Sequence, residues 1–149
     1  MKRPALVLFD LAGVLAHYEH APRLRVLSER LGTSESAVAG ALFESGLERE
    51  AALGRIDTDG MLATLGERLG VPVTLDDCLA ARAAAMRAND TVLGLAAAAG
   101  RHATLAFLTN NGLMLRDHFE EICLRAHTYR DEAGLRAHLA AHDLLETER

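Results

Sequence analysis

Two short apolar stretches of this chain each run into polar residues and a glycine. The first covers residues 5–9, leads directly into Asp10 and is followed by Gly13. The second covers residues 103–108 and leads into Thr109, Asn110, Asn111 and Gly112. Runs this short and apolar are typical of strands that are buried on both faces, as in parallel sheets. The pattern therefore predicts two buried strands, each followed by polar side chains at its C-terminal end.

The chain between these strands has the spacing of helices. Apolar residues recur three or four positions apart, and small polar residues or glycines separate the groups. The expected helices cover residues 22–31, 34–45, 47–53, 58–69, 75–88 and 91–99. Thr74 and Asp77 form a near capping box at the start of one of them. From Glu19 to Asn89 the pattern thus predicts helices alone, which is longer than a simple connection between two strands.

The helix over 91–99 and the second strand complete a βαβ unit with the first strand. Because such connections are right-handed, both strands are expected to be parallel and to end at the same edge. Asp10 and Thr109 would meet there, where open α/β sheets bind ligands. The pattern predicts a short helix over 115–119, a strand over 124–129 and a final helix over 132–145. The expected class is therefore α/β, with a long helical insertion.

Composition and charge exclude several classes of function. The chain has 149 residues, is 50% apolar and carries 21 acidic against 16 basic residues, a net charge of −5. Such a balance gives no basic footprint for nucleic acid. No apolar run reaches the length of a membrane span, and the chain before Asp10 is too short for a signal peptide. We therefore expect a cytoplasmic protein with no nucleic-acid or membrane partner. Cys78 and Cys123 match no metal or redox spacing.

The stretches FDLAGVL (residues 9–15) and LAFLTNNG (residues 105–112) resemble the first two motifs of the haloacid dehalogenase-like (HAD) hydrolase superfamily. The resemblance implies a HAD-like Rossmannoid core with an inserted helical cap. The core would consist of residues 1–15 and 91–149, and the cap of residues 16–90. The parallel sheet of this core would be truncated. The implied activity is that of a Mg²⁺-dependent phosphatase acting on a small phosphorylated metabolite.

The resemblance also implies roles for single residues. Asp10 would be the nucleophile that forms an aspartyl-phosphate. Thr109 would bind the phosphate with its hydroxyl, next to Asn110, whose turn offers backbone N–H groups to an anion. Mg²⁺ would be held by the Asp10 carboxylate and the backbone carbonyl of Ala12.

Three features depart from the family pattern. Ala12 stands where phosphatases of the family usually have a second aspartate as general acid. Lys2 is the only lysine, so the family's phosphate-binding lysine is missing, and arginine does not replace it conservatively. No apolar strand ending in two aspartates follows Thr109. The nearest substitutes are three arginines and one acidic pair: Arg116, Arg125, Arg130 and Asp131–Glu132.

A single internal deletion accounts for the last two departures. The segment from residue 125 to 145 resembles the closing strand and helix of full-length relatives, and it follows Cys123 almost directly. We therefore hypothesise that a segment between about Cys123 and Leu124 is missing. A complete domain that uses other residues is the alternative.

Other functions stay open beside the phosphatase. One is a dehalogenase that uses Asp10 on carbon without a metal. Another is a non-catalytic remnant that binds a partner, or a second copy of itself as a homodimer, through the open edges of a small sheet. His17, Tyr18 and His20 follow the first turn and are candidates for substrate contact.

Overall fold

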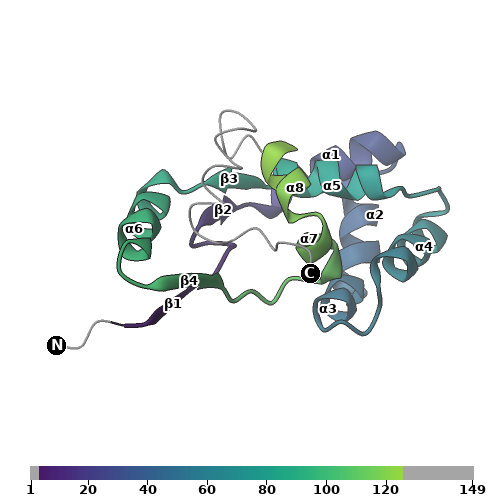
Figure 1. The fold of residues 1–149 in the computed structure, drawn as a ribbon. Coiled ribbons are helices and arrows are strands. Elements are labelled where there is room, and N and C mark those ends of the chain that lie inside the picture. Colours follow the sequence, from purple (N-terminus) through teal and green to yellow (C-terminus); the bar gives the residue numbers. More distant parts are fainter. Residues whose placement is uncertain (1–3, 126–149) are drawn as a thin grey trace.

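Residues 4–125 are described by the computed structural model, and they form four strands and a largely helical remainder (Figure 1). The strands are β1 (Leu6–Phe9), β2 (Ala16–Tyr18), β3 (Met86–Ala88) and β4 (Thr104–Phe107). The helices are α1 (His20–Leu31), α2 (Glu35–Ala39), α3 (Leu47–Ala52), α4 (Thr58–Leu69), α5 (Leu75–Ala84), α6 (Asp90–Gly100), α7 (Leu113–Asp117) and α8 (Phe119–Arg125). A π-helix, η1 (Gly40–Glu44), continues α2.

β1 and β4 form the predicted parallel pair, in register from Leu6 opposite Thr104 to Phe9 opposite Phe107. Leu105 is buried and helix α6 packs against β4. The expectation that β1 is buried on both faces is wrong, because Leu6 and Leu8 are each 51% exposed. Among the described residues this sheet has two strands, so the face that carries these leucines has no layer to cover it.

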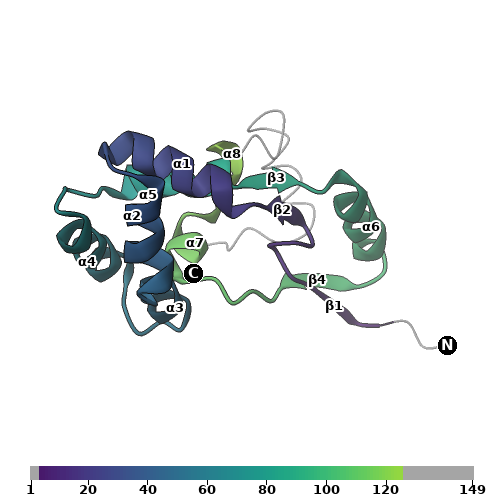
Figure 2. The ribbon, with the colours of Figure 1, turned by 180° about the vertical axis from the view of Figure 1, so that it is seen from behind.

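A second, antiparallel pair was not predicted: β3 lies where the sequence predicted the end of a helix, and β2 lies just after the first turn. β2 pairs with β3, and hydrogen bonds from Glu19 N–H to Ala85 O (2.9 Å) and from Asn89 N–H to Leu15 O (2.9 Å) extend the pairing at both ends. Helix α5 therefore ends at Ala84 and not near Ala88. The alanines of this segment favour a helix locally, but pairing with a distant strand overrides that propensity. Figures 1 and 2 show β2 and β3 between the β1–β4 pair and the helices α1–α5.

The helices from α1 to α5 begin where the sequence indicated. The side chains of Ser34, Asp57 and Thr74 accept hydrogen bonds from backbone N–H groups of α2, α4 and α5, respectively. The expected capping box between Thr74 and Asp77 is present. Asn89, one residue before the expected Asp90, caps α6.

The core of this helical part is made of fully buried apolar side chains. Leu27, Val38, Leu42, Leu65 and Leu79 are all at most 2% exposed. Burying each such side chain contributes roughly 1.5–3 kcal/mol. Helix α1 packs against α5 along this core. The division into a core of 1–15 and 91–149 and a cap of 16–90 stays a prediction.

The end of the described chain is helical. α7 begins at Leu113, directly after Gly112, and α8 runs to Arg125 and packs on α5. The strand predicted from residue 124 is therefore wrong at its start, because Ile122 and Cys123 are buried on a helix that an i, i+4 pair between Glu121 and Arg125 extends. The rest of that strand, the final helix, Arg130 and Asp131–Glu132 lie outside the described residues. In the part that is described, none of the helices is both long and apolar enough to cross a membrane.

Candidate active site

Asp10 stands at the C-terminal end of β1 and is exposed. Its Oδ1 accepts a hydrogen bond from the N–H of Leu11 at 2.7 Å. The turn that follows is closed by bonds from Ala16 N–H to Leu11 O (2.9 Å) and from Gly13 N–H to Ala16 O (2.7 Å). Gly13 has a φ of 85°, a conformation that glycine adopts without strain. The tight turn therefore holds the carboxylate at the tip of the strand, in contact with solvent.

Thr109 and Asn110 lie just beyond the end of β4, and both are exposed. The N–H of Leu108 donates to the carbonyl of Phe9 at 2.9 Å, so the parallel pairing persists to the last residue before Asp10. Asp10 and Thr109 therefore follow neighbouring strands at one edge of the sheet. Ala12 is half-buried in the turn and forms a bridge with Ala16. The structure thus gathers the four sequence-predicted residues at one edge, while their chemical roles stay predictions.

The segment after β4 leaves the sheet and runs to the helical part of the molecule, as both views show (Figures 1 and 2). Asn111 Nδ2 donates to the hydroxyl oxygen of Thr109 at 2.5 Å. Gly112 lies directly on α3, since a Cβ at this position would be 2.7 Å from the carbonyl oxygen of Ala51. At Gly112 the chain is therefore already packed against the helices and not against the sheet.

A buried group of charges, hereafter the arginine cluster, lies where these residues meet the helices; it consists of Arg23, Glu48 and Arg82. Arg23 binds Glu48 in a bidentate pair, with Nη1–Oε1 and Nη2–Oε2 distances of 2.8 and 2.9 Å. Arg82 Nη1 donates to the same Oε1 at 2.9 Å, and its Nη2 donates to Oδ1 of Asn111. Arg23 is 2% and Arg82 4% exposed. Two buried guanidinium groups therefore share one carboxylate.

Burial and the charges of the cluster shift the pKa values of all three of its residues. Burial by itself would lower the pKa of Arg23, but the adjacent Glu48 outweighs it and raises that pKa above the usual value. Burial alone would raise the pKa of Glu48, yet the two arginines hold it below its ordinary range. Burial, and then the charge of Arg23, lower the pKa of Arg82. Arg82 is thus the cation of the cluster with the least compensation.

Aromatic side chains complete the surroundings of the cluster. The hydroxyl of Tyr18 accepts a bond from Arg23 Nη1 at 3.0 Å, and the Arg23 guanidinium lies 5.2 Å from the centre of the Phe43 ring. His20 packs edge-on against both rings. Tyr18 and His20 therefore contact the cluster or its neighbours, while His17 and His20 are both exposed; a substrate contact by His17, Tyr18 or His20 stays a prediction.

The sequence reasoning missed all three charges of the cluster. One signal for Arg82 was available, because it is the only polar residue in the run of nine from Cys78 to Met86. A charge within an apolar helix is rarely buried unless it is paired. Glu48 and Arg23 lie in ordinary charged stretches, and nothing local distinguishes them.

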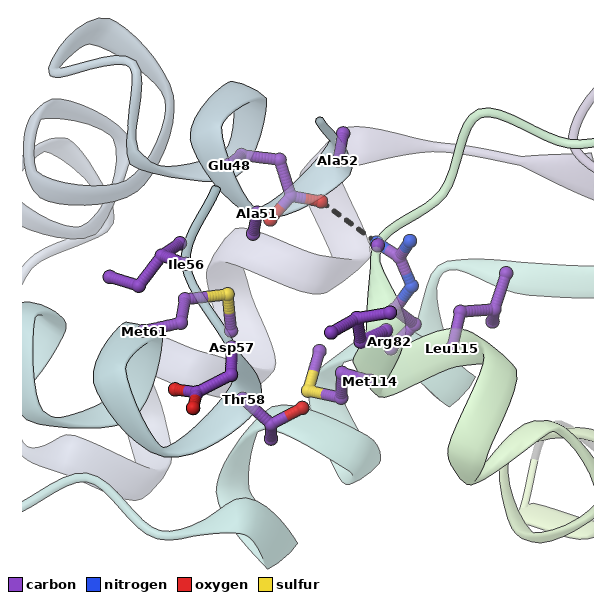
Figure 3. Close-up of a pocket in the computed structure, with 12 residues that line it drawn as sticks. Glu48, Ala51, Ala52, Ile56, Asp57, Thr58, Met61, Arg82, Met114 and Leu115 are labelled. Atoms are coloured by element: carbon purple, nitrogen blue, oxygen red, sulfur yellow. Dashed lines mark hydrogen bonds and ion pairs between the residues drawn. The ribbon is translucent and has the colours of Figure 1, made fainter. Parts of the chain in front are cut away.

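A small pocket, with about 20 Å³ of space for the centre of a water molecule, lies between α3, α4, α5 and α7, beside Gly112 (Figure 3). Its polar side is formed by Glu48 and Arg82, which Figure 3 shows facing each other across a dashed ion pair. Its apolar side includes Met61 and Met114. The arginine cluster therefore borders this pocket through Glu48 and Arg82.

The substitutes for the missing lysine lie elsewhere. Arg125 binds Asp76 at 2.7 Å and Glu121 at 2.6 Å on the outer side of α5 and α8. Arg116 pairs with Asp117 at 2.6 Å. Both arginines thus bind carboxylates of the helical part, whereas Arg82 reaches Thr109 through a single residue, Asn111.

Metal-binding groups are sparse in the part of the chain that is described. Between residues 4 and 125 no three His, Cys, Asp or Glu side chains gather as a metal site. Mg²⁺ takes six oxygen ligands but keeps several waters and often uses one or two carboxylates plus the phosphate of a substrate. That Asp10 and the carbonyl of Ala12 fill two positions of such a site stays a prediction.

The sequence matches no protein-family model, and no curated protein matches it. Solved structures do match. The HAD family enzyme BT-2542 from Bacteroides thetaiotaomicron has 19% identity and a TM-score of 0.65 over 85% of this chain and 61% of its own. The same enzyme in complex with magnesium and inorganic phosphate gives 18% identity and a TM-score of 0.65 over 84% of this chain. A predicted HAD-like family hydrolase from Porphyromonas gingivalis gives 16% identity and a TM-score of 0.65, over 93% of this chain and 76% of its own.

These matches bear on the fold. The chain spans about three fifths of the BT-2542 chain, which agrees with the expectation of a truncated sheet. The chain therefore has the α/β fold of the HAD family enzymes, with a shortened parallel sheet and an inserted helical cap.

Proposed function

We propose that this chain is a phosphohydrolase of the HAD type that acts on a small phosphorylated metabolite, with Asp10 as its nucleophile. One observation carries the proposal: the parallel register of β1 and β4 puts the exposed Asp10 and Thr109 at the same edge of the sheet. The crystallised complex of BT-2542 with magnesium and inorganic phosphate, on the same fold, supports a phosphate ligand.

In the proposed reaction a carboxylate oxygen of Asp10 attacks the phosphorus of the ester. The bond from phosphorus to the leaving oxygen breaks, and that oxygen takes a proton from water because residue 12 is alanine. Water then attacks the phosphorus of the aspartyl-phosphate, which releases inorganic phosphate and restores Asp10. The Leu11 N–H holds Oδ1 at 2.7 Å, so the other oxygen, Oδ2, is the one assigned to the attack.

Positive charge and hydrogen-bond donors must meet the charge that develops on the phosphate. Thr109 would donate its hydroxyl, and the backbone N–H groups near Asn110 would assist. Mg²⁺, held by Asp10 and the Ala12 carbonyl, would supply charge neutralisation when bound. With no lysine after Lys2, we expect turnover to be slow for the family.

The experiment is release of inorganic phosphate from a panel of phosphate esters, with MgCl₂ or with EDTA. We expect release that needs MgCl₂ and disappears in Asp10→Asn. Asp90→Asn, which changes an exposed aspartate at the start of α6, is the matched control and should keep the wild-type rate. Release that persists in Asp10→Asn would contradict the proposal. Metal-independent halide release from 2-haloacids would replace it with the dehalogenase.

A second candidate function, self-association, is favoured by one observation. Leu6 and Leu8 are half-exposed on one face of a sheet that has two strands in the described part of the chain. A second copy of the chain would cover this apolar face. Formation of the proposed homodimer does not depend on the chain being an active enzyme.

A further inference from the structure

A continuous chain of side-chain contacts leads from the helical cap to the hydroxyl of Thr109. Glu48 Oε1 accepts from Arg82 Nη1 at 2.9 Å, and Arg82 Nη2 donates to Oδ1 of Asn111. Asn111 Nδ2 then donates to Thr109 Oγ1 at 2.5 Å. Four residues, drawn from α3, α5 and the segment after β4, therefore form one hydrogen-bond relay.

The relay fixes the direction of each hydrogen bond. A guanidinium group can only donate, so the Asn111 atom that faces Arg82 must be the carbonyl oxygen. The amide nitrogen of Asn111 is thereby turned to Thr109, where it donates. Because Thr109 Oγ1 accepts this bond, its own hydrogen is released to donate to another group. At the end of β4, beside Asp10, a phosphate oxygen is the acceptor that the proposed function supplies.

The far end of the relay is a rigid anchor. The side chain of Arg82 is 5% exposed, and Glu48, to which it binds, is also held by the bidentate pair with Arg23. Close contact between Gly112 and α3 keeps the connecting segment against the cap. The side chain of Asn111 therefore has little freedom to rotate. Its hydrogen bond to Thr109 in turn fixes the orientation of the Thr109 hydroxyl.

The anchor also carries net positive charge. Within the arginine cluster two guanidinium groups face one carboxylate. Solvent ions screen buried charges much less than exposed ones. The cluster therefore favours an anion near the segment to which it is bonded, in a chain whose only lysine is Lys2.

We infer that Arg82 is a positioning residue for the phosphate-binding hydroxyl of Thr109, which it orients through Asn111. The inference rests on the proposed function, since it assigns Thr109 to phosphate. It adds that affinity for phosphate depends on a residue of the cap, although Arg82 itself does not touch the ligand. Docking of α5 against the segment after β4 thus becomes a condition for binding.

The test is titration of the full chain with inorganic phosphate in MgCl₂, followed by NMR at the backbone amides of Thr109 and Asn111. Asn111→Ala breaks the relay at a half-buried residue and leaves the Arg82–Glu48 pair in place. We expect it to raise the Kd about tenfold, or about 1.4 kcal/mol. Arg82→Gln should raise the Kd by a similar factor. The double variant should be no worse than Asn111→Ala, because both changes remove one interaction.

Arg23→Gln is the matched control for Arg82→Gln. It removes one positive charge from the arginine cluster, as Arg82→Gln does, but leaves Asn111 untouched, so we expect lower stability and a smaller rise in Kd than in Arg82→Gln. A purely structural role for Arg82 would give both arginine variants the same phosphate affinity. Arg82→Lys keeps the charge but lacks the fork that spans two acceptors, and it should recover part of the loss.

Two results overturn the inference and are distinguishable. In the first, Thr109→Ala abolishes phosphate binding while Asn111→Ala binds phosphate as the wild type does. In that case the hydrogen-bond relay does not contribute to binding, and the proposed function stands. If the wild type shows no phosphate binding, the proposed function fails and the positioning role fails with it. Should Arg82→Gln not fold, Asn111→Ala decides the question alone.

Discussion

Glu48 is the carboxylate that pairs with both buried arginines of the arginine cluster. It accepts three bonds from Arg23 and Arg82, whose side chains are 3% and 5% exposed. Breaking a buried ion pair by removing one partner typically costs about 3–5 kcal/mol. We expect Glu48→Gln to lower the free energy of unfolding by that amount, measured by urea denaturation at pH 7. Glu50→Gln, which loses only the exposed 3.0 Å pair with Arg55, should cost less than about 1 kcal/mol.

The Glu48 carboxylate also makes the free energy of unfolding depend on pH. Because Arg23 and Arg82 hold the pKa of Glu48 below its usual range, its contribution is present above the unfolded pKa of about 4.3. The contribution is lost as the pH falls through the lower pKa of the folded state. We therefore expect the gap in stability between wild type and Glu48→Gln to shrink below about pH 4. A gap that is constant from pH 7 to pH 3 would contradict this assignment.

The two cysteines are predicted to be inert in the folded protein. Both are buried, and burial raises the pKa of Cys78 to about 11 and that of Cys123 to about 12. The thiolate is the reactive form, so at pH 8 almost none is present. We expect slow modification by a disulfide reagent in buffer and fast modification of both thiols in urea. Fast reaction in buffer would show that the helical part opens more readily than its packing suggests.

At the scale of elements, contact between the segment after β4 and helix α3 depends on a missing side chain. A Cβ on Gly112 would lie 2.7 Å from the Ala51 carbonyl oxygen, and that backbone atom cannot rotate away. We expect Gly112→Ala to push the segment off the cap, at a cost of about 1–3 kcal/mol. Under the relay proposed above, phosphate affinity should fall as well. Calorimetric unfolding and phosphate titration measure the two effects.

Gly94→Ala is the control for this prediction. Gly94 lies within α6, and a Cβ there would meet nothing within 4 Å. An alanine inside a helix is more stable than glycine by roughly 0.5–1 kcal/mol, so this variant should gain stability. If both glycine variants changed stability in the same direction, the close contact at Gly112 would not be the cause.

At the scale of the whole molecule, the sequence predicted features that depend on residues close together in the chain. It missed features that depend on residues far apart in the chain. The cap at Thr74 depends on Asp77, three positions away, and the sequence located this pair. The parallel pair was predictable because the turn chemistry after each strand marks its end. β3 and the arginine cluster depend on partners far along the chain, such as the pairing of Met86 with Tyr18. Local propensity carries no information on such partners.

The exposed face of β1 is the surface on which the proposed homodimer depends. Leu6 and Leu8 project from the same face of the strand, and each is 51% exposed. Edges and faces of small sheets that lack cover tend to associate with other chains. For the proposed homodimer we expect a mass that rises toward a dimer with concentration, measured by light scattering after gel filtration. Leu8→Lys should keep the protein monomeric and change its stability by less than about 0.5 kcal/mol.

Leu95→Lys is the control that distinguishes association through the exposed face of β1 from nonspecific association through any exposed apolar residue. Leu95 lies on α6 and is 64% exposed, more than Leu8, so a nonspecific association would respond to it at least as strongly. A dimer that forms through β1 should survive Leu95→Lys and be lost in Leu8→Lys. Equal loss in both variants points to nonspecific association, and a wild type that stays monomeric at every concentration rules out the homodimer. Because Asp10 follows β1 directly, a dimer on this face would also bring two proposed active sites close to one interface.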